Sequence, residues 1–493
     1  MGDESLKNKT VKGVGWSTTE MILRYGVSFV IGIILARLLT PDEYGLIGIL
    51  TIFITLFEII IDGGFANALI RKKDAVDIDY CTVFYTNMVL SILMSGLLIL
   101  CATPIAHFFE REELVPLTIA LSPIVIINAL AIVQRVQFSK KLDFKSQAII
   151  TLISAIGSGG VGIWMAYKGY GVWALVGQQL SNAGLNTILL WVLNRWWPGL
   201  KFSWKSFRDM WSFGWKLLVG GLLNSLSGQV HNAVIGKIYA PATLGQYTRG
   251  NQFAGLASSN ISNVISKVTY PVLSVIQDDH VKLKSSYKRL IRTTALPTFI
   301  LLMGMCAMAK PLLLALIGPQ WDKAPLFMQI LCFSMLVNPL QRLNINALLV
   351  KGRSDLNLKI NVINNILIVI PVLIGIYTNI YWMLIADVLR NYLAYYLNAY
   401  YNKELLNYSF SEQIRDITPS FLVAISTAIP CYLLGMLPFP TLSLFPIQIV
   451  VWLVLVVVVC EKTKLPEYTE LKGIAIPMIK KVLRKNRFIS QII

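Results

Sequence analysis

Charged residues are scarce in this chain of 493 residues: they make up only 14% of it, whereas hydrophobic residues make up 55%. Soluble domains usually carry about 25% charged residues. The scarcity extends over the whole length, and the longest polar segments run only about 15 to 30 residues, which excludes a sizeable soluble domain. The composition is typical of a polytopic membrane protein.

Signatures of enzymes and metal sites are also missing. The six cysteines are scattered without a CxxC pair, and the three histidines (His107, His231 and His280) lie far apart. Neither a disulfide framework nor a metal site is therefore expected. The sequence has no GxxxxGK[ST] loop and no HExxH motif. We expect no catalytic residue, no resident cofactor and no step driven by ATP.

What the chain has instead is a series of apolar runs and an excess of positive charge. Runs of about 20 residues recur along the whole length, enough for about fourteen membrane-spanning helices. The net charge is +18, and most of the 44 basic residues gather in alternate connections. Because cytoplasmic loops are the basic ones, we expect both termini in the cytoplasm. The charge then reports topology and attraction to anionic membrane lipids, and no nucleic-acid partner is expected.

The chain also repeats itself. Matched residues recur in register at offsets of 200 and then 207: Pro41 and Gly45 with Pro241 and Gly245, and Gln134-Arg135 with Gln341-Arg342. A run of such matches indicates duplication. An even number of spans in each copy makes both copies enter the membrane the same way round, with a central cleft between two lobes.

The expected fold is an all-α polytopic membrane protein with two six-helix lobes, related as a parallel repeat, and a C-terminal helix pair. In chain order we expect a first lobe at 1–193, a cytoplasmic linker at 194–210, a second lobe at 211–402, the helix pair at 403–460 and a basic cytoplasmic tail at 461–493. The last two spans are apolar on all sides, which indicates that they face lipid or a lipid-like ligand.

Polar residues interrupt several of these spans. Ionisable groups deep in a membrane are costly unless they face one another or a wet cavity, so they are candidates for a functional site. Arg24 and Glu58 lie at a similar depth in the first two spans, and Asp62 follows Glu58 by one helical turn. The residues expected to bind substrate are Arg24, Glu58, Asp62, Gln178, Asn182, Arg249, Asn260, Lys267, Arg342, Asp387 and Arg390.

Two interpretations of this set stay open. The polar groups could lock helices together through hydrogen bonds and ion pairs, with Lys267 and Arg342 extending to the membrane interface. Alternatively they line a hydrated cavity, in which amides and hydroxyls suit sugars and the cations suit a phosphate or pyrophosphate. We favour the cavity, because dry packing would need a partner for every amide and every charge.

Several motifs carry a family resemblance. They are LARLLTPDEYG at 35–45, DGGF at 62–65, QFSKKLDF at 137–144, YTRGNQ at 247–252 and YPVLS at 270–274. With these motifs the chain resembles the polysaccharide transport (Wzx-type, WzxC-like) family of the multidrug, oligosaccharidyl-lipid and polysaccharide flippase superfamily. The resemblance covers nearly the whole chain.

The resemblance implies a bacterial inner-membrane flippase. Such a protein turns an undecaprenyl-pyrophosphate-linked oligosaccharide from the cytoplasmic to the periplasmic leaflet by alternating access, for O-antigen, capsule or exopolysaccharide synthesis. By the same resemblance the last helix pair would hold the polyprenyl tail, a polysaccharide polymerase is an expected partner, and the acidic residues could bind a coupling H⁺ or Na⁺. The alternatives are a drug or cation antiporter of the same superfamily and a membrane polysaccharide polymerase.

Overall fold

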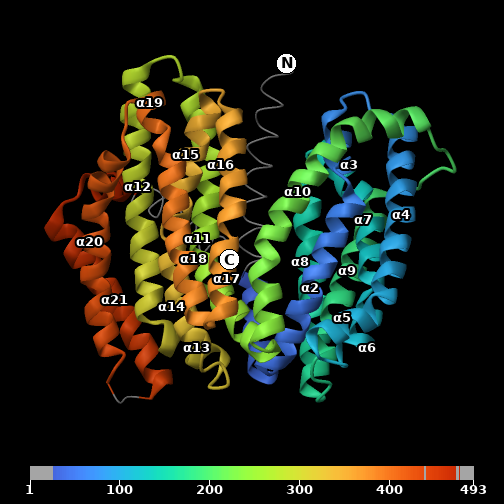
Figure 1. The fold of residues 1–493 in the computed structure, drawn as a ribbon, viewed down its shortest axis with the longest axis horizontal. Coiled ribbons are helices and arrows are strands. Elements are labelled where there is room, and N and C mark those ends of the chain that lie inside the picture. Colours follow the sequence, from blue (N-terminus) through green and yellow to red (C-terminus); the bar gives the residue numbers. More distant parts are fainter. Residues whose placement is uncertain (1–25, 438–439, 474–476, 478–493) are drawn as a thin grey trace, which may run out of the picture. The chain divides into compact units, whose positions relative to one another are not determined.

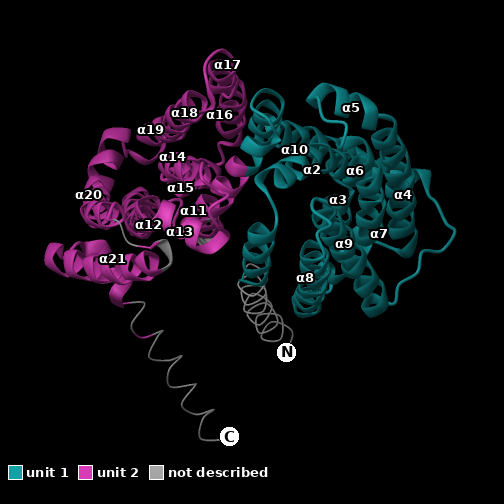
Figure 2. Cartoon of the chain, turned by 90° about the horizontal axis from the view of Figure 1, so that it is seen from below, with its two compact units in different colours: residues 1–245 teal, residues 246–493 magenta. Residues whose placement is uncertain are grey.

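The computed structural model describes residues 26–437, 440–473 and 477, and the regular secondary structure in this part of the chain is helical (Figure 1). Contacts divide the chain into two compact units, Met1–Gly245 and Gln246–Ile493 (Figure 2). Within the described ranges, nine segments are long and apolar enough to cross a membrane, and Gly26–Leu38 forms a shorter apolar helix. The chain is a multi-pass membrane protein; the count of fourteen spans and the lobe boundaries stay predictions.

Unit 1 consists of helices that pack mainly as neighbouring pairs, among them α8 on α9, α2 on α10 and α4 on α7. Its helices are α2 (Pro41–Asp62), α3 (Phe65–Arg71), α4 (Asp77–Leu100), α5 (Ala102–Phe109), α6 (Leu114–Leu121), α7 (Pro123–Lys140), α8 (Phe144–Tyr167), α9 (Trp173–Asn194) and α10 (Trp204–Ile238). The start of α2 follows from its sequence. Thr40 and Glu43 form a reciprocal capping box, and Pro41 needs no hydrogen-bond acceptor at the first helical position.

Unit 2 contains most of α11 (Pro241–Val275) and the helices that follow it. These are α12 (His280–Ala307), α13 (Ala309–Ile317), α14 (Ala324–Met335), α15 (Asn338–Val350), α16 (Ser354–Leu367), α17 (Val369–Tyr377), α18 (Ile380–Tyr400), α19 (Asn402–Leu406), α20 (Phe410–Leu434) and α21 (Thr441–Thr463). In this unit α12 packs extensively against α20, and α21 packs on α20 and α13.

A buried carboxylate joins α12 to α20 in unit 2. Asp416 is 4% exposed; it forms ion pairs with Arg292 and, at 3.1 Å, with Lys288, and it accepts a hydrogen bond of 2.7 Å from the Tyr408 hydroxyl. Burial, and then the bond to Asp416, raises the pKa of Tyr408 above its ordinary value, so this hydroxyl stays a donor. Three donors on one buried carboxylate fix the two helices in register.

Matched positions of the repeat occupy matched places in the helices. Both α2 and α11 begin at the repeated proline, Pro41 and Pro241. These two first turns also touch within unit 1: a Cβ on Gly45 would overlap the backbone of Pro241, and a Cβ on Gly245 would overlap that of Pro41. Glycine is therefore required at both positions, because only its missing side chain lets the two backbones approach.

We expect Gly45→Ala to lower the free energy of unfolding of the detergent-purified protein by about 1–3 kcal/mol, because the added methyl group meets backbone atoms rather than a flexible side chain. The measurement is a thermal melt followed by size-exclusion chromatography. Gly96→Ala is the matched control, since nothing lies within 4 Å of a Cβ at that helical glycine. Equal melting of the two variants would contradict the close approach of the first turns.

A second prediction concerns Asp416. We expect Asp416→Asn to destabilise the protein by about 1–3 kcal/mol, because it leaves two half-exposed cations without their counter-charge. The matched control is Asp355→Asn, which removes the exposed pair with Arg353 and should change stability by less than about 1 kcal/mol. A melting temperature for Asp416→Asn equal to that of the control would show that the cluster does not stabilise unit 2.

Candidate functional site

Two adjoining polar cavities lie within unit 1 and have volumes of about 500 and 530 Å³. Asn128, Arg135 and Asn182 line both of them, so α7 and α9 form the common wall. Glu58 and Asp62 of α2 line the larger one. Each volume falls in the range of about 300–1,000 Å³ that is typical of small-ligand clefts.

The charged groups of these cavities are held by amides. Glu58 Oε1 accepts a hydrogen bond of 2.6 Å from Asn128 Nδ2, and Arg135 Nη2 donates one of 3.0 Å to Asn186 Oδ1. The charges of Glu58 and Arg135 interact without a direct ion pair. An acid and a base in one cavity balance each other electrostatically, and each keeps room for a further partner.

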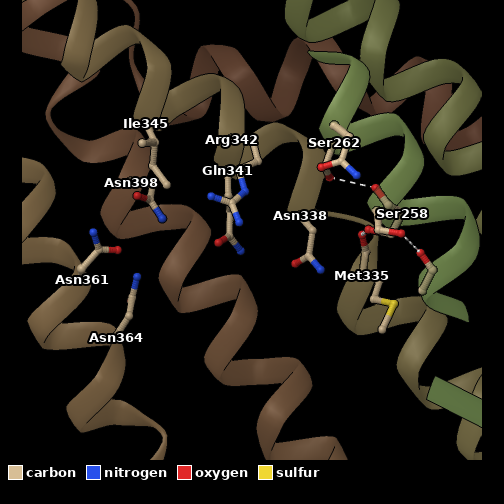
Figure 3. Close-up of a pocket in the computed structure, with 13 residues that line it drawn as sticks. Ser258, Ser262, Met335, Asn338, Gln341, Arg342, Ile345, Asn361, Asn364 and Asn398 are labelled. Atoms are coloured by element: carbon tan, nitrogen blue, oxygen red, sulfur yellow. Dashed lines mark hydrogen bonds between the residues drawn. The ribbon is translucent and has the colours of Figure 1, made fainter. Parts of the chain in front are cut away.

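Unit 2 holds a third polar cavity, of about 620 Å³. Figure 3 shows Asn361 and Asn364 on one side, Ser258 and Ser262 on the other, and Arg342 between them. Among the described lining residues, Arg342 is the only charged one. Most of the other lining side chains carry amides or hydroxyls, which suits a ligand rich in hydroxyl groups.

Four of the predicted site residues line these cavities. They are Glu58, Asp62 and Asn182 in unit 1 and Arg342 in unit 2. Arg24 lies outside the described residues. For Lys267 the structure describes the backbone within α11 and not the side chain, so both stay predictions.

Five other predicted residues make contacts within the helix bundle and do not line the described cavities. Asp387 and Arg390 form an ion pair of 2.8 Å along α18, with side chains 14% and 18% exposed. Arg249 donates to Gln252 and lies over the Trp321 ring at 5.8 Å.

The amides of Gln178 and Asn260 serve similar local roles. Gln178 packs so closely on Gly162 of α8 that a Cβ there would lie 3.0 Å from the Gln178 Cβ. Asn260 Nδ2 donates to the Leu256 carbonyl of its own helix at 2.7 Å. These bonds of Asn260, Arg249, Asp387 and Arg390 thus give each polar group a partner within its own helix, and they do not join one helix to another.

Reasoning from the sequence missed two residues at the centre of unit 1. Arg135 is not among the residues predicted to bind substrate, yet it lies within α7 and lines both cavities. Asn128, the partner of Glu58, was not singled out either. The repeat held the missing signal, since Arg135 and Arg342 are matched positions and Arg342 was a candidate.

Residues 34–325 match the model of the polysaccharide biosynthesis protein family. The lipopolysaccharide biosynthesis protein WzxC of Escherichia coli strain K12 is 24% identical over 440 residues, which cover 87% of this chain and 88% of WzxC. The teichuronic acid biosynthesis protein TuaB of Bacillus subtilis strain 168 is 24% identical over 354 residues, covering 71% of this chain and 73% of TuaB.

A solved structure of the lipid II flippase MurJ, in an inward closed conformation, has a similar fold. The TM-score is 0.75 at 13% sequence identity, and the match covers 92% of this chain and 99% of that one. The chain thus shares its fold with MurJ. Because the family model matches more than half of its length, this chain belongs to the polysaccharide biosynthesis protein family, as its motifs predicted.

Proposed function

We propose that this protein is a flippase that moves an undecaprenyl-pyrophosphate-linked oligosaccharide from the cytoplasmic to the periplasmic leaflet of a bacterial inner membrane. The main observation behind the proposal is that cavities lined by amides, hydroxyls and arginines lie between the apolar helices. The names of relatives support it: WzxC and TuaB are polysaccharide biosynthesis proteins, and MurJ is a lipid II flippase. Both termini would lie in the cytoplasm, as the basic connections indicate.

The chemistry of the cavities suits this task. A sugar–pyrophosphate head cannot enter hydrocarbon unaided, because its polar groups would lose their hydrogen bonds to water. The amides and arginines of the cavities replace that water, while the polyprenyl tail stays in lipid. Alternating access would expose the polar surface to one side of the membrane and then to the other. A polysaccharide polymerase is the protein partner that would receive the product.

We further infer that Glu58 and Asp62 take part in ion coupling. The charges of Glu58 and Arg135 interact, so an H⁺ or Na⁺ bound at Glu58 would free Arg135 to attract an anion. Loss of that ion would restore the internal balance and release the anion. The affinity for substrate and the affinity for the ion are thereby linked in free energy.

We expect Arg135→Ala to reduce flipping at least about tenfold, because a charge-assisted hydrogen bond to an anion contributes about 1.5–3 kcal/mol. The measurement is translocation of a fluorescent polyprenyl-pyrophosphate-linked sugar in proteoliposomes. Arg353→Ala is the control, since Arg353 forms an exposed ion pair with Asp355. Full translocation by Arg135→Ala would remove Arg135 from the transport path.

Coupling is tested by imposed gradients of H⁺ and Na⁺ across the same proteoliposomes. We expect one of the two gradients to accelerate flipping by the wild-type chain, and Glu58→Gln to abolish the response while the protein still inserts and melts normally. A wild-type rate that ignores both gradients would refute ion coupling and leave the flippase proposal intact.

A further inference from the structure

The cavities of the two units are built from matching positions of the repeat, and the matched residues differ in charge. At the offset of 207, Arg135 of the unit 1 cavities corresponds to Arg342 of the unit 2 cavity. At the offset of 200, Glu58 and Asp62 correspond to Ser258 and Ser262, which also line their cavity. The arginine is therefore present in both copies of the repeat, whereas the carboxylates are present only in unit 1.

This difference leaves the two arginines in opposite electrostatic states. Arg135 shares its cavity with two carboxylates and interacts with the charge of Glu58. Arg342 is exposed to its cavity and makes no hydrogen bond or ion pair with any residue that the structure describes. A cation at membrane depth without a counter-charge is costly, and an anionic ligand would remove that cost.

The amides around Arg342 point to the rest of the ligand. Asn398 is 1% exposed, and its Oδ1 has no hydrogen-bond partner in the described part of the chain; the buried Oδ1 of Asn364 is also unpartnered there. Ser258 and Ser262 use their hydrogens on helix carbonyls, at 3.3 and 2.8 Å. The serine oxygens therefore remain acceptors for the hydroxyl groups of a sugar. The two amide oxygens lie in the wall of the cavity with almost no exposed surface, and a rotation of either side chain would present its unpartnered oxygen to a ligand.

We propose that the unit 2 cavity is the subsite for the anionic glycan end of the substrate. Arg342 binds an oxyanion, either the pyrophosphate or a sugar carboxylate, and the lining residues Asn364 and Asn398 turn their buried, unpartnered amide oxygens toward sugar hydroxyls when the ligand binds (Figure 3). The cavities of unit 1, balanced by their own carboxylates, bind this anion much more weakly until an ion neutralises Glu58. The lipid-linked nature of the ligand rests on the proposed function; the anion-binding role of Arg342 does not.

The test introduces into the unit 2 cavity a carboxylate like those that line the unit 1 cavity. Ser262→Asp and Ser262→Asn differ only in charge, and the aspartate reproduces the arrangement around Arg135. The probes are undecaprenyl pyrophosphate without sugar and free glucuronate, bound to the full chain in nanodiscs. We expect Ser262→Asp to bind about tenfold more weakly than Ser262→Asn, and Arg342→Gln to lose a similar factor against wild type, as loss of a charge-assisted pair predicts.

The two probes separate the sources of the anion. Loss of affinity for undecaprenyl pyrophosphate alone assigns the phosphate to Arg342, and loss for glucuronate alone assigns a sugar carboxylate; either supports the subsite. Equal affinities of wild type and Arg342→Gln for both probes, in variants that melt normally, would overturn it. Weaker binding after Arg135→Gln but not after Arg342→Gln would move the anion to unit 1 and overturn it as well.

The sugar half of the proposal has its own comparison. Asn364→Ala should weaken binding of a sugar-bearing polyprenyl pyrophosphate at least about threefold and leave the bare lipid unaffected, since only a hydroxyl donor uses its Oδ1. Equal losses for both lipids would refute the sugar contact. A flipping assay in proteoliposomes separates the test of the subsite from the test of the proposed function. A wild-type chain that binds the anion through Arg342 but moves no polyprenyl-linked sugar would refute the proposed function and leave the subsite proposal intact.

Discussion

The structure depends on one constraint: a polar group inside a hydrocarbon layer must find a partner in the protein or face a wet cavity. Many groups here follow the first course. Asn344 Oδ1 accepts from Asn402 at 2.6 Å and also from the Tyr287 hydroxyl, in fully buried surroundings. Fewer polar groups face a cavity, and those that do lie together. This clustering distinguishes a candidate site from polar groups that serve helix packing.

Duplication explains why the two units share so much and then differ. The bond from Asn194 to Gln137 at 2.8 Å has a counterpart 207–208 residues later, from Asn402 to Asn344 at 2.6 Å. Such structural amides keep the helices of each unit in the same register. The cavity positions differ instead: unit 1 has two carboxylates where unit 2 has two hydroxyls, which gives the cavities of the two units different charges.

Sequence rules selected some residues that line the described cavities and others that do not, for identifiable reasons. The rule that ionisable residues within apolar runs are site candidates selected Glu58 and Asp62, which line a cavity, because depth alone makes them costly. The same rule selected Asp387 and Arg390, which neutralise each other one turn apart on α18. The i, i+3 spacing is the same whether the two residues form an ion pair with each other or face a cavity. The sequence alone therefore cannot distinguish these two arrangements. Arg135 was missed because an arginine near the end of a span resembles a topology signal.

The sequence by itself determined that the chain is a multi-pass membrane protein of this family, that matched residues recur along it, and that polar residues interrupt its spans, because composition, periodicity and motifs are local properties of the chain. Only the tertiary structure decided which side chains share a cavity. That depends on how each helix is rotated and packed against its neighbours, as Arg135 of α7 with Glu58 of α2 and Arg342 of α15 with the serines of α11 demonstrate. Packing, which joins residues hundreds of positions apart, therefore turned a list of costly polar groups into cavities with distinct charges.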